Sequence, residues 1–225
     1  MALLKLENIC YGYEDGGMRR EILKDLSYEF EAGKFYTILG PSGSGKTTLL
    51  SIIAGLDVAD KGKVYYDGED IQTMGLDKYR RNKMGIVFQQ FNLINYLTGL
   101  ENLEIAMTET ENELPKDQKK IAYALLEKFG IVKSKADRVV TKLSGGEQQR
   151  VAIARSMATN VDLIFADEPT GNLDSETEKE IIRIFRNLTE EYGKTVIVVT
   201  HSDSVSSLSD LKLFLNDGKL EDIKR

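Results

Sequence analysis

Residues 40–47 read Gly-Pro-Ser-Gly-Ser-Gly-Lys-Thr, and this stretch decides the fold. Its glycines let the backbone curl so that successive N–H groups point at one anion. An apolar segment, 35–39, precedes the stretch and a helical pattern, 46–54, follows it, which is the context that a phosphate-binding loop requires. The start of the helix adds partial positive charge. The stretch therefore predicts a nucleotide site in which Lys46 reaches the β- and γ-phosphates and Thr47 binds Mg²⁺.

Short apolar runs indicate the strands. Continuous runs, typical of strands buried on both faces of a parallel sheet, occupy residues 35–39, 85–88, 161–166 and 196–200. Segments that alternate between apolar and polar residues, and so predict half-buried antiparallel strands, are 3–9, 26–30 and 63–66. The turn signal Asn-Asp-Gly at 216–218 predicts a hairpin between residues 211–215 and 219–223.

Helical patterns lie between these strands, at residues 46–54, 116–129, 147–158 and 175–192. Ser175 is the expected N-cap of the last helix. Because strands and helices alternate, the sequence predicts an α/β fold with a parallel-sheet core. Residues 78–142 are mostly helical and are expected to form a subdomain inserted into one domain that spans 1–225. Within them, the polar and acidic stretch 108–120 predicts an exposed loop.

Composition excludes some classes of protein. The formal net charge of −6 disfavours a sequence-independent nucleic-acid binder, which needs a basic face. Cys10 is the one cysteine, so no intramolecular disulfide forms, and we expect it to be a small buried hydrophobe. The first residues do not resemble a signal peptide, and no apolar run approaches the roughly 20 residues that span a bilayer. Any role at a membrane therefore predicts a membrane partner.

Two adjacent acids, Asp167 and Glu168, end the apolar run 161–166. Because side chains alternate along a strand, one acid faces the metal while the next faces an attacking water. Asp167 is then the Mg²⁺-side carboxylate, and Glu168 polarises or deprotonates the water. Alone, the pair is more simply an ordinary strand exit. The phosphate-binding loop makes the catalytic interpretation the better one.

Leu-Ser-Gly-Gly-Glu at 143–147 opens a helix and has two interpretations. Small residues at a helix start allow close approach of an anion. Ser144 with Glu147 three residues later is also a capping box, which needs no ligand. His201, the single histidine, follows the run 196–200, where it is either a solvated end residue or a phosphate contact.

Taken together, these motifs resemble the ATP-binding cassette (ABC) transporter ATPases along essentially the whole chain. Residues 143–148 match the family signature, residues 40–47 its Walker A loop, and Asp167-Glu168 its Walker B carboxylates. Gln89 matches the Q-loop glutamine, residues 172–174 the D-loop, and His201 the switch histidine. Tyr13 matches the aromatic residue that stacks on adenine, with Tyr11 as the alternative.

The resemblance implies roles for individual residues. It assigns catalysis to Glu168, His201 and Gln89, and Mg²⁺ binding to Thr47, Gln89 and Asp167. It assigns ATP binding to Tyr13, Gly40, Ser42, Gly43, Ser44, Gly45, Lys46, Thr47, Thr48, Ser144, Gly145, Gly146, Glu147 and Asp174.

The resemblance also implies partners. Two cassettes of this family meet head to tail, so that each ATP lies between the Walker A loop of one and the signature of the other. A homodimer bound to an integral membrane permease, on the cytoplasmic face of the membrane, is therefore expected. Residues 91–96 would lie near the groove that receives the permease's coupling helix.

Within the family, residues 54–57, 88–93 and 167–174 resemble the branch of MacB, LolD and the bacitracin-resistance exporters. That resemblance implies export of antimicrobial peptides or macrolides, resistance to them, or release of lipoproteins. The cell-division cassette FtsE is a near alternative. A soluble ABC ATPase that acts on nucleic acid or ribosomes is another alternative, which the acidic charge disfavours. A regulatory module that holds ATP without turnover is disfavoured by the intact Glu168 and His201.

Overall fold

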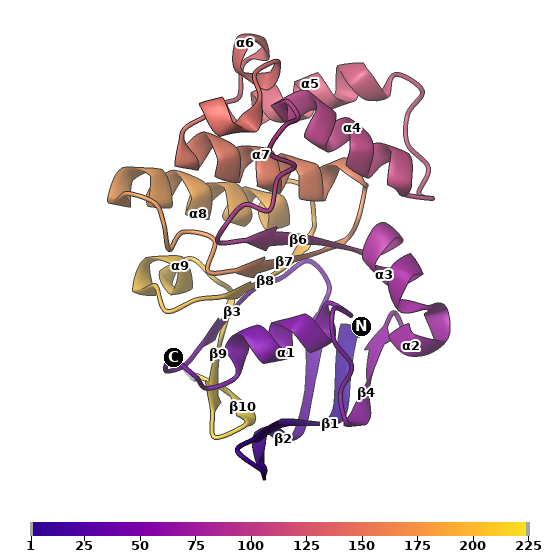
Figure 1. Ribbon diagram of the computed structural model, residues 1–225, viewed down its shortest axis with the longest axis vertical. Helices are drawn as coiled ribbons and strands as arrows, with labels where there is room; N and C mark the ends of the chain where they lie inside the picture. The colour runs from indigo at the N-terminus through magenta and orange to yellow at the C-terminus, as the bar shows by residue number, and fades with distance from the viewer. Residues whose placement is uncertain (1, 224–225) are drawn as a thin grey trace.

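The computed structural model describes residues 2–223 and contains two β-sheets with helices between and around them (Figure 1). The larger sheet has six strands in the order β10-β9-β3-β8-β7-β6. All of its neighbouring pairs are parallel except the β9–β10 hairpin. The expected parallel core and C-terminal hairpin are thus confirmed. Its strands are β3 (Phe35–Leu39), β6 (Met84–Phe88), β7 (Leu163–Asp167), β8 (Thr195–Val199), β9 (Leu211–Asn216) and β10 (Lys219–Asp222).

The smaller sheet is antiparallel, in the order β2-β1-β4-β5. Its strands are β1 (Ala2–Asp15), β2 (Met18–Glu31), β4 (Lys61–Tyr66) and β5 (Glu69–Asp70). The first two are longer than expected because the hairpin continues to a turn at Gly16 and Gly17, both with positive φ. The polar strand ends there carry no hydrophobic alternation that would reveal them. Cys10 is half-buried rather than buried, and its Sγ accepts a hydrogen bond from the Asp25 N–H at 3.3 Å.

The six-stranded sheet separates two hydrophobic cores. Leu163 and Phe165 of β7 point into the core shared with the antiparallel sheet and helix α1 (Lys46–Ile53). Ile164 and Ala166 point into the other core, under the helices drawn above the sheet in Figure 1. All four side chains are fully buried, which explains why this strand reads as a continuous apolar run.

The helices on the second face are α4 (Gly99–Glu109), α5 (Gln118–Lys128), α6 (Lys133–Ala136), α7 (Gly145–Ala158) and α8 (Ser175–Glu190). Short helices α2 (Ile71–Met74), α3 (Leu76–Asn82) and α9 (Asp203–Ser207), with a 3₁₀ turn at Val140–Lys142, complete the fold. The interval 78–142 is not purely helical, because it contains β6, which pairs with β7 in the parallel sheet. The helical layer therefore begins at α4. The proposed domain limits 1–225 include residues 1, 224 and 225, which lie outside the described residues.

Two local expectations need correction. The N-cap of α8 is Asp174, not Ser175, because Asp174 Oδ1 accepts hydrogen bonds from the N–H groups of Glu176 (3.1 Å) and Thr177 (3.0 Å). Both residue types are good caps, so composition did not distinguish them. The loop expected at 108–120 spans only the gap between α4 and α5. Asn112 anchors this loop, since its Nδ2 donates to the carbonyl oxygens of Asn82 and Thr159, both at 2.8 Å.

Candidate ATPase site

The phosphate-binding loop connects β3 to α1, as its sequence predicts. Gly45 has a φ of 97°, and a Cβ there would lie 2.5 Å from Ile22 Cγ2, so conformation and space both require glycine. The Lys46 ammonium donates to the carbonyl oxygens of Gly40 (2.9 Å) and Pro41 (3.0 Å). Ser44 Oγ is buried and has no hydrogen-bond partner among the described residues. The loop thus brings together the positively charged ammonium of Lys46 and the Ser44 hydroxyl, which makes no hydrogen bond among the described residues.

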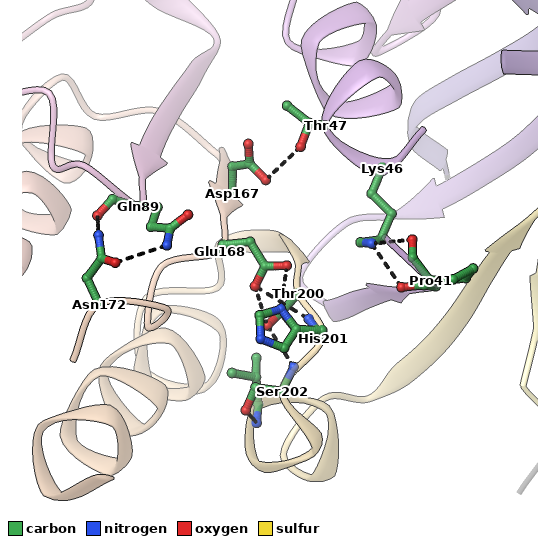
Figure 2. Close-up of polar contacts among 12 residues, drawn as sticks. Pro41, Lys46, Thr47, Gln89, Asp167, Glu168, Asn172, Thr200, His201 and Ser202 are labelled. Atoms are coloured by element: carbon green, nitrogen blue, oxygen red, sulfur yellow. Dashed lines mark hydrogen bonds and ion pairs between the residues drawn. The ribbon is translucent and has the colours of Figure 1, made fainter. Parts of the chain in front are cut away.

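Asp167 is the last residue of β7 and lies opposite the loop's helix. Its Oδ1 accepts a hydrogen bond from Thr47 Oγ1 at 3.4 Å (Figure 2). Burial raises the pKa of Asp167 above the usual aspartate value, and the Thr47 hydrogen bond opposes that rise. A partly buried carboxylate beside a hydroxyl forms an oxygen-rich pair suited to a hard cation.

Glu168 follows the last residue of β7 and is not part of the strand. The alternation of side chains along a strand therefore cannot explain how it is oriented. Its φ is 45°, in the left-handed region, and its N–H donates to the Val199 carbonyl at 2.9 Å. Strand alternation therefore does not set its direction, contrary to the expectation from the sequence. A left-handed non-glycine residue is uncommon and is often found at functional sites.

The carboxylate of Glu168 is held by residues that follow β8. Thr200 Oγ1 donates to Oε2 at 3.1 Å, and His201 Nδ1 lies 2.9 Å from Oε1. The His201 N–H makes a longer contact of 3.4 Å with Oε2. Thr200 is fully buried, whereas the His201 side chain is 75 % exposed. Thr200 was not singled out from the sequence, because a buried threonine at a strand end looks like ordinary core.

Gln89 follows β6 and contacts the loop after Glu168. Its Nε2 donates to Asn172 Oδ1 at 3.1 Å, and Asn172 Nδ2 donates to the Gln89 carbonyl at 3.3 Å (Figure 2). The loops after β3, β6, β7 and β8 thus bring Lys46, Gln89, Glu168 and His201 to one edge of the sheet. That edge, the carboxyl ends of parallel strands, is where α/β sheets bind ligands.

The signature residues form a capping box at the start of α7. Ser144 Oγ accepts from the Glu147 N–H (3.3 Å), and Glu147 Oε2 accepts from the Ser144 N–H (2.9 Å). Glu147 Oε1 pairs with Lys135 at 2.5 Å, and this hydrogen bond lowers the pKa of Glu147. Both carboxylate oxygens of Glu147 are therefore engaged within the chain.

The two signature glycines differ in their surroundings. A Cβ on Gly146 would lie 2.4 Å from Thr177 Cγ2, so α8 alone explains this glycine. A Cβ on Gly145 would meet only ordinary contacts, Leu173 and Phe91 at 3.7 Å. Within residues 2–223, no hydrogen bond or ion pair joins 144–147 to the phosphate-binding loop. The D-loop residue Asp174 is likewise engaged locally: the Thr177 hydroxyl donates to its Oδ2 at 2.7 Å and lowers its pKa.

The two candidate adenine-stacking tyrosines are in different environments. Tyr11 is half-buried, and its hydroxyl donates to Asp57 Oδ2 at 2.7 Å, which raises its pKa. Tyr13 is 45 % exposed and pairs across the hairpin with Arg20. Arg20 lines a cleft of about 280 Å³ together with the phosphate-binding loop residues 41–44. The turn at Gly16 and Gly17 sets the register that places Tyr13 opposite Arg20.

Comparison with known proteins identifies the class. A family model described as ABC transporter matches residues 23–171. The ABC transporter ATP-binding protein YclH of Bacillus subtilis is 43 % identical over 97 % of this chain and 95 % of its own length. The structure of the cassette MJ0796 of Methanocaldococcus jannaschii, described as a dimeric post-hydrolysis state bound to ADP and Pi, matches with a TM-score of 0.87. That match has 39 % identity and covers 99 % of both chains.

The chain therefore belongs to the ABC transporter family, as an ATP-binding protein with the ABC ATPase fold. The macrolide export protein MacB of Bdellovibrio bacteriovorus is also similar, with 40 % identity over 99 % of this chain. This chain corresponds to 34 % of that longer ATP-binding/permease protein. Within residues 2–223, none of the helices combines the length and apolar character that crossing a bilayer requires.

Proposed function

We propose that the cluster at the carboxyl ends of the parallel strands binds Mg²⁺-ATP and hydrolyses it. The orientation of Glu168 carries this proposal: its carboxylate is fixed by Thr200 and His201 on the side of the sheet that holds Lys46 and Thr47. In the proposed reaction Glu168 accepts a proton from the attacking water, and His201 contacts the γ-phosphate. Lys46 exchanges its two carbonyl acceptors for phosphate oxygens.

The donors around Asp167 fit Mg²⁺. Thr47 and Asp167 supply a hydroxyl and a carboxylate oxygen 3.4 Å apart, and Gln89 supplies an amide oxygen. Among residues 2–223, no group of three or more His, Cys, Asp or Glu side chains could hold a metal ion. Such a sparse oxygen set is typical of Mg²⁺, which shares its coordination with substrate phosphates and water. When bound there, Mg²⁺ would neutralise charge on the phosphates.

The direct test is hydrolysis by the purified protein. We expect release of phosphate from ATP that stops when EDTA removes Mg²⁺. Lys46→Ala should weaken ATP binding and hydrolysis strongly, because the loop then lacks its cation. Lys212→Ala, on β9, is a control outside the proposed site. Equal ATPase activity in the wild type and Lys46→Ala would contradict the proposed site.

We further propose that the working unit is a head-to-tail homodimer. Among the described residues, the signature residues make no hydrogen bond to their own phosphate-binding loop, and the surroundings of Gly145, with Leu173 and Phe91 at 3.7 Å from a Cβ, do not by themselves require glycine. In this arrangement Ser144 and Gly145 meet the γ-phosphate held by the other subunit, through a helix N-terminus. Glu147 and Gly146 support that surface from behind, since both are engaged within the chain. The dimeric solved structure of the relative MJ0796 supports this assembly.

A groove of about 270 Å³ between the sheet and the helical layer is the proposed docking place for a permease. Apolar and charged side chains share its wall, among them Leu56, Arg81, Met84, Ala106, Glu109 and Arg155. Burial lowers the pKa of Arg155, whose guanidinium donates to the Asn92 carbonyl at 2.6 Å and the Phe91 carbonyl at 3.4 Å. Through these hydrogen bonds, Arg155 links the groove to the segment that follows Gln89. A permease bound here would hold the protein at the cytoplasmic face of the membrane.

Residues 91–96 differ in their surroundings, and we propose different roles for them. Phe91 packs against the helical core and Leu93 is buried, so these two support the segment from inside. Tyr96 is 80 % exposed and remains available to a partner. Tyr96→Ala should therefore reduce copurification with the proposed permease partner, without lowering the ATPase activity of the isolated protein.

For the transported substrate, we propose export of antimicrobial peptides or macrolides, or release of lipoproteins. The similarity to MacB supports export. Deletion of the gene should increase sensitivity to a macrolide or to bacitracin, and Glu168→Gln should fail to complement it. Unchanged sensitivity to both compounds, with mislocalised lipoproteins, would favour the lipoprotein alternative. The acidic charge continues to disfavour nucleic acid as a partner.

A further inference from the structure

The amides of Gln89 and Asn172 form a reciprocal pair that the proposed catalytic roles leave unexplained. The two residues lie in different loops, one after β6 and one after β7. Asn172 contacts both ends of Gln89: it accepts from the side-chain nitrogen and donates to the backbone carbonyl. Both side chains are exposed, so burial does not force this arrangement.

The donor and acceptor pattern fixes how both amides are turned. A backbone carbonyl only accepts, so the Asn172 group 3.3 Å from the Gln89 carbonyl must be its NH₂. The Asn172 oxygen is then the atom that faces the Gln89 side chain, at 3.1 Å, and this oxygen only accepts. Gln89 must therefore present its NH₂ to Asn172. Its side-chain oxygen points away from Asn172, on the side where Asp167 lies (Figure 2).

Gly171 gives the Gln89 amide its space. A Cβ on Gly171 would lie 2.7 Å from Gln89 Nε2 and 3.2 Å from Cδ. Gly171 does not have a positive φ, so backbone conformation does not require glycine here. The close approach of the Gln89 amide is the reason in this structure. Gly171 thus leaves room for the Gln89 side chain, and Asn172 forms the hydrogen bond that orients it.

We propose that Asn172 is a positioning residue that turns the oxygen of Gln89 toward the Mg²⁺ site. The proposal rests on the proposed function, in which Gln89 binds Mg²⁺. Mg²⁺ accepts an amide oxygen and not an amide NH₂, so the orientation of the amide decides whether Gln89 is a ligand.

The test is the effect of Mg²⁺ on nucleotide affinity at equilibrium. The dissociation constant of a non-hydrolysable ATP analogue is measured by calorimetry in EDTA and in Mg²⁺, and their ratio is the Mg²⁺ coupling. Asn172→Ala should lower this coupling about two- to ten-fold, the range expected for loss of one ordinary hydrogen bond. The affinity in EDTA should not change. Damage to the fold would instead weaken both affinities.

Matched variants separate positioning from other effects. Gln90→Ala removes the neighbouring exposed amide, whose side chain has no hydrogen bond among the described residues, and should keep the wild-type coupling. Gly171→Ala should lower the coupling as Asn172→Ala does, because its methyl group displaces the Gln89 amide. In a Gln89→Ala background, Asn172→Ala should have no further effect.

Three results would overturn the proposal. Asn172→Ala with wild-type coupling removes the role of Asn172 and leaves the proposed ATPase site standing. A decrease that persists in the Gln89→Ala background shows that Asn172 acts by another route. If Mg²⁺ does not tighten nucleotide binding to the wild type at all, the proposed Mg²⁺ site fails together with the role of Asn172.

Discussion

The His201 imidazole Nδ1 lies 2.9 Å from Oε1 of Glu168, while the Thr200 hydroxyl donates to the other carboxylate oxygen at 3.1 Å. The two contacts come from consecutive residues after β8, and Glu168 follows β7. The orientation of the carboxylate is therefore fixed by the pairing of two neighbouring strands. A carboxylate held in this way is preorganised to accept a proton from water.

Glu168→Gln should bind ATP but hydrolyse it about 10² to 10⁴ times more slowly, the usual contribution of a general base. The amide keeps the shape of the side chain and still accepts from Thr200, so the fold and the affinity should be retained. Phosphate release and size-exclusion chromatography with ATP would show slow turnover and accumulated dimer. Glu113→Gln, in the loop before α5, is the control. Wild-type turnover in Glu168→Gln would rule out its role as the base.

Mixing inactive subunits tests the shared site. Lys46→Ala removes the phosphate-binding cation, and Gly145→Asp places a negative charge at the signature. The Gly145 site tolerates a side chain within its own subunit, because a Cβ there makes only 3.7 Å contacts. A heterodimer of the two variants keeps one intact site, so the mixture should hydrolyse more ATP than the two separate proteins together. If no mixing ratio gives this excess, each subunit has a complete site of its own.

Glu147→Gln should cost at most about 1 kcal/mol at neutral pH, because the Lys135 pair is partly exposed. Glutamine still completes the capping box. The pKa of Glu147 is lowered from its usual 4.5, so its charge stabilises the folded protein above that pH. This stabilisation is lost as the pH falls through the lowered pKa. Thermal melts should show a difference at pH 7 that shrinks below pH 4.5, with unchanged ATP affinity.

The tyrosine pair predicts two different phenotypes. Tyr13→Ala should raise the KM for ATP and leave kcat nearly unchanged, because its exposed ring is free to stack on adenine. Tyr11→Phe should cost about 1 kcal/mol of stability through loss of the Asp57 hydrogen bond, without a change in KM. Steady-state kinetics and denaturant melts separate the two. An unchanged KM in Tyr13→Ala would point instead to Tyr11 or to no stacking at all.

Gly146→Ala should destabilise the protein by about 1–2 kcal/mol, because its methyl group would lie 2.4 Å from Thr177 Cγ2. The better helix propensity of alanine offsets part of this cost. Thr177→Ser removes the obstructing methyl group and keeps the hydroxyl that binds Asp174. The double variant should therefore regain most of the lost stability in urea melts. Equal destabilisation in single and double variants would point to another cause.

Much of the fold was predictable from the sequence, because its strongest features are local. Continuous apolar runs marked β3, β6, β7 and β8, and Asn-Asp-Gly at 216–218 marked the hairpin of β9 and β10. The ends of β1 and β2 were not predictable in the same way. Their residues are polar on both faces, and cross-strand pairing near a Gly-Gly turn extends them. The apolar run at 85–88 did mark β6, although this strand lies within the mostly helical interval 78–142.

The site was predictable as a set of motifs but not as a geometry. Motif order gave Lys46, Asp167, Glu168 and His201, which the structure brings to one sheet edge. The left-handed backbone of Glu168 was not visible, because nothing in its residue type requires it. Thr200 and Asn172 were also missed as contacts, since both depend on loops that meet only in three dimensions.

The alternate packing of β7 into two cores has a mechanical consequence. Leu163 and Phe165 pack into the core on one side of the strand, and Ile164 and Ala166 pack into the core on the other side. Buried side chains therefore hold the strand that ends in Asp167 on both faces, and we expect its backbone to be among the least mobile parts of the protein. The loops that carry Gln89 and Asn172 are exposed and are not packed on both sides in this way. We therefore expect Asp167 to keep its position when nucleotide binds, while the loop residues beside it adjust.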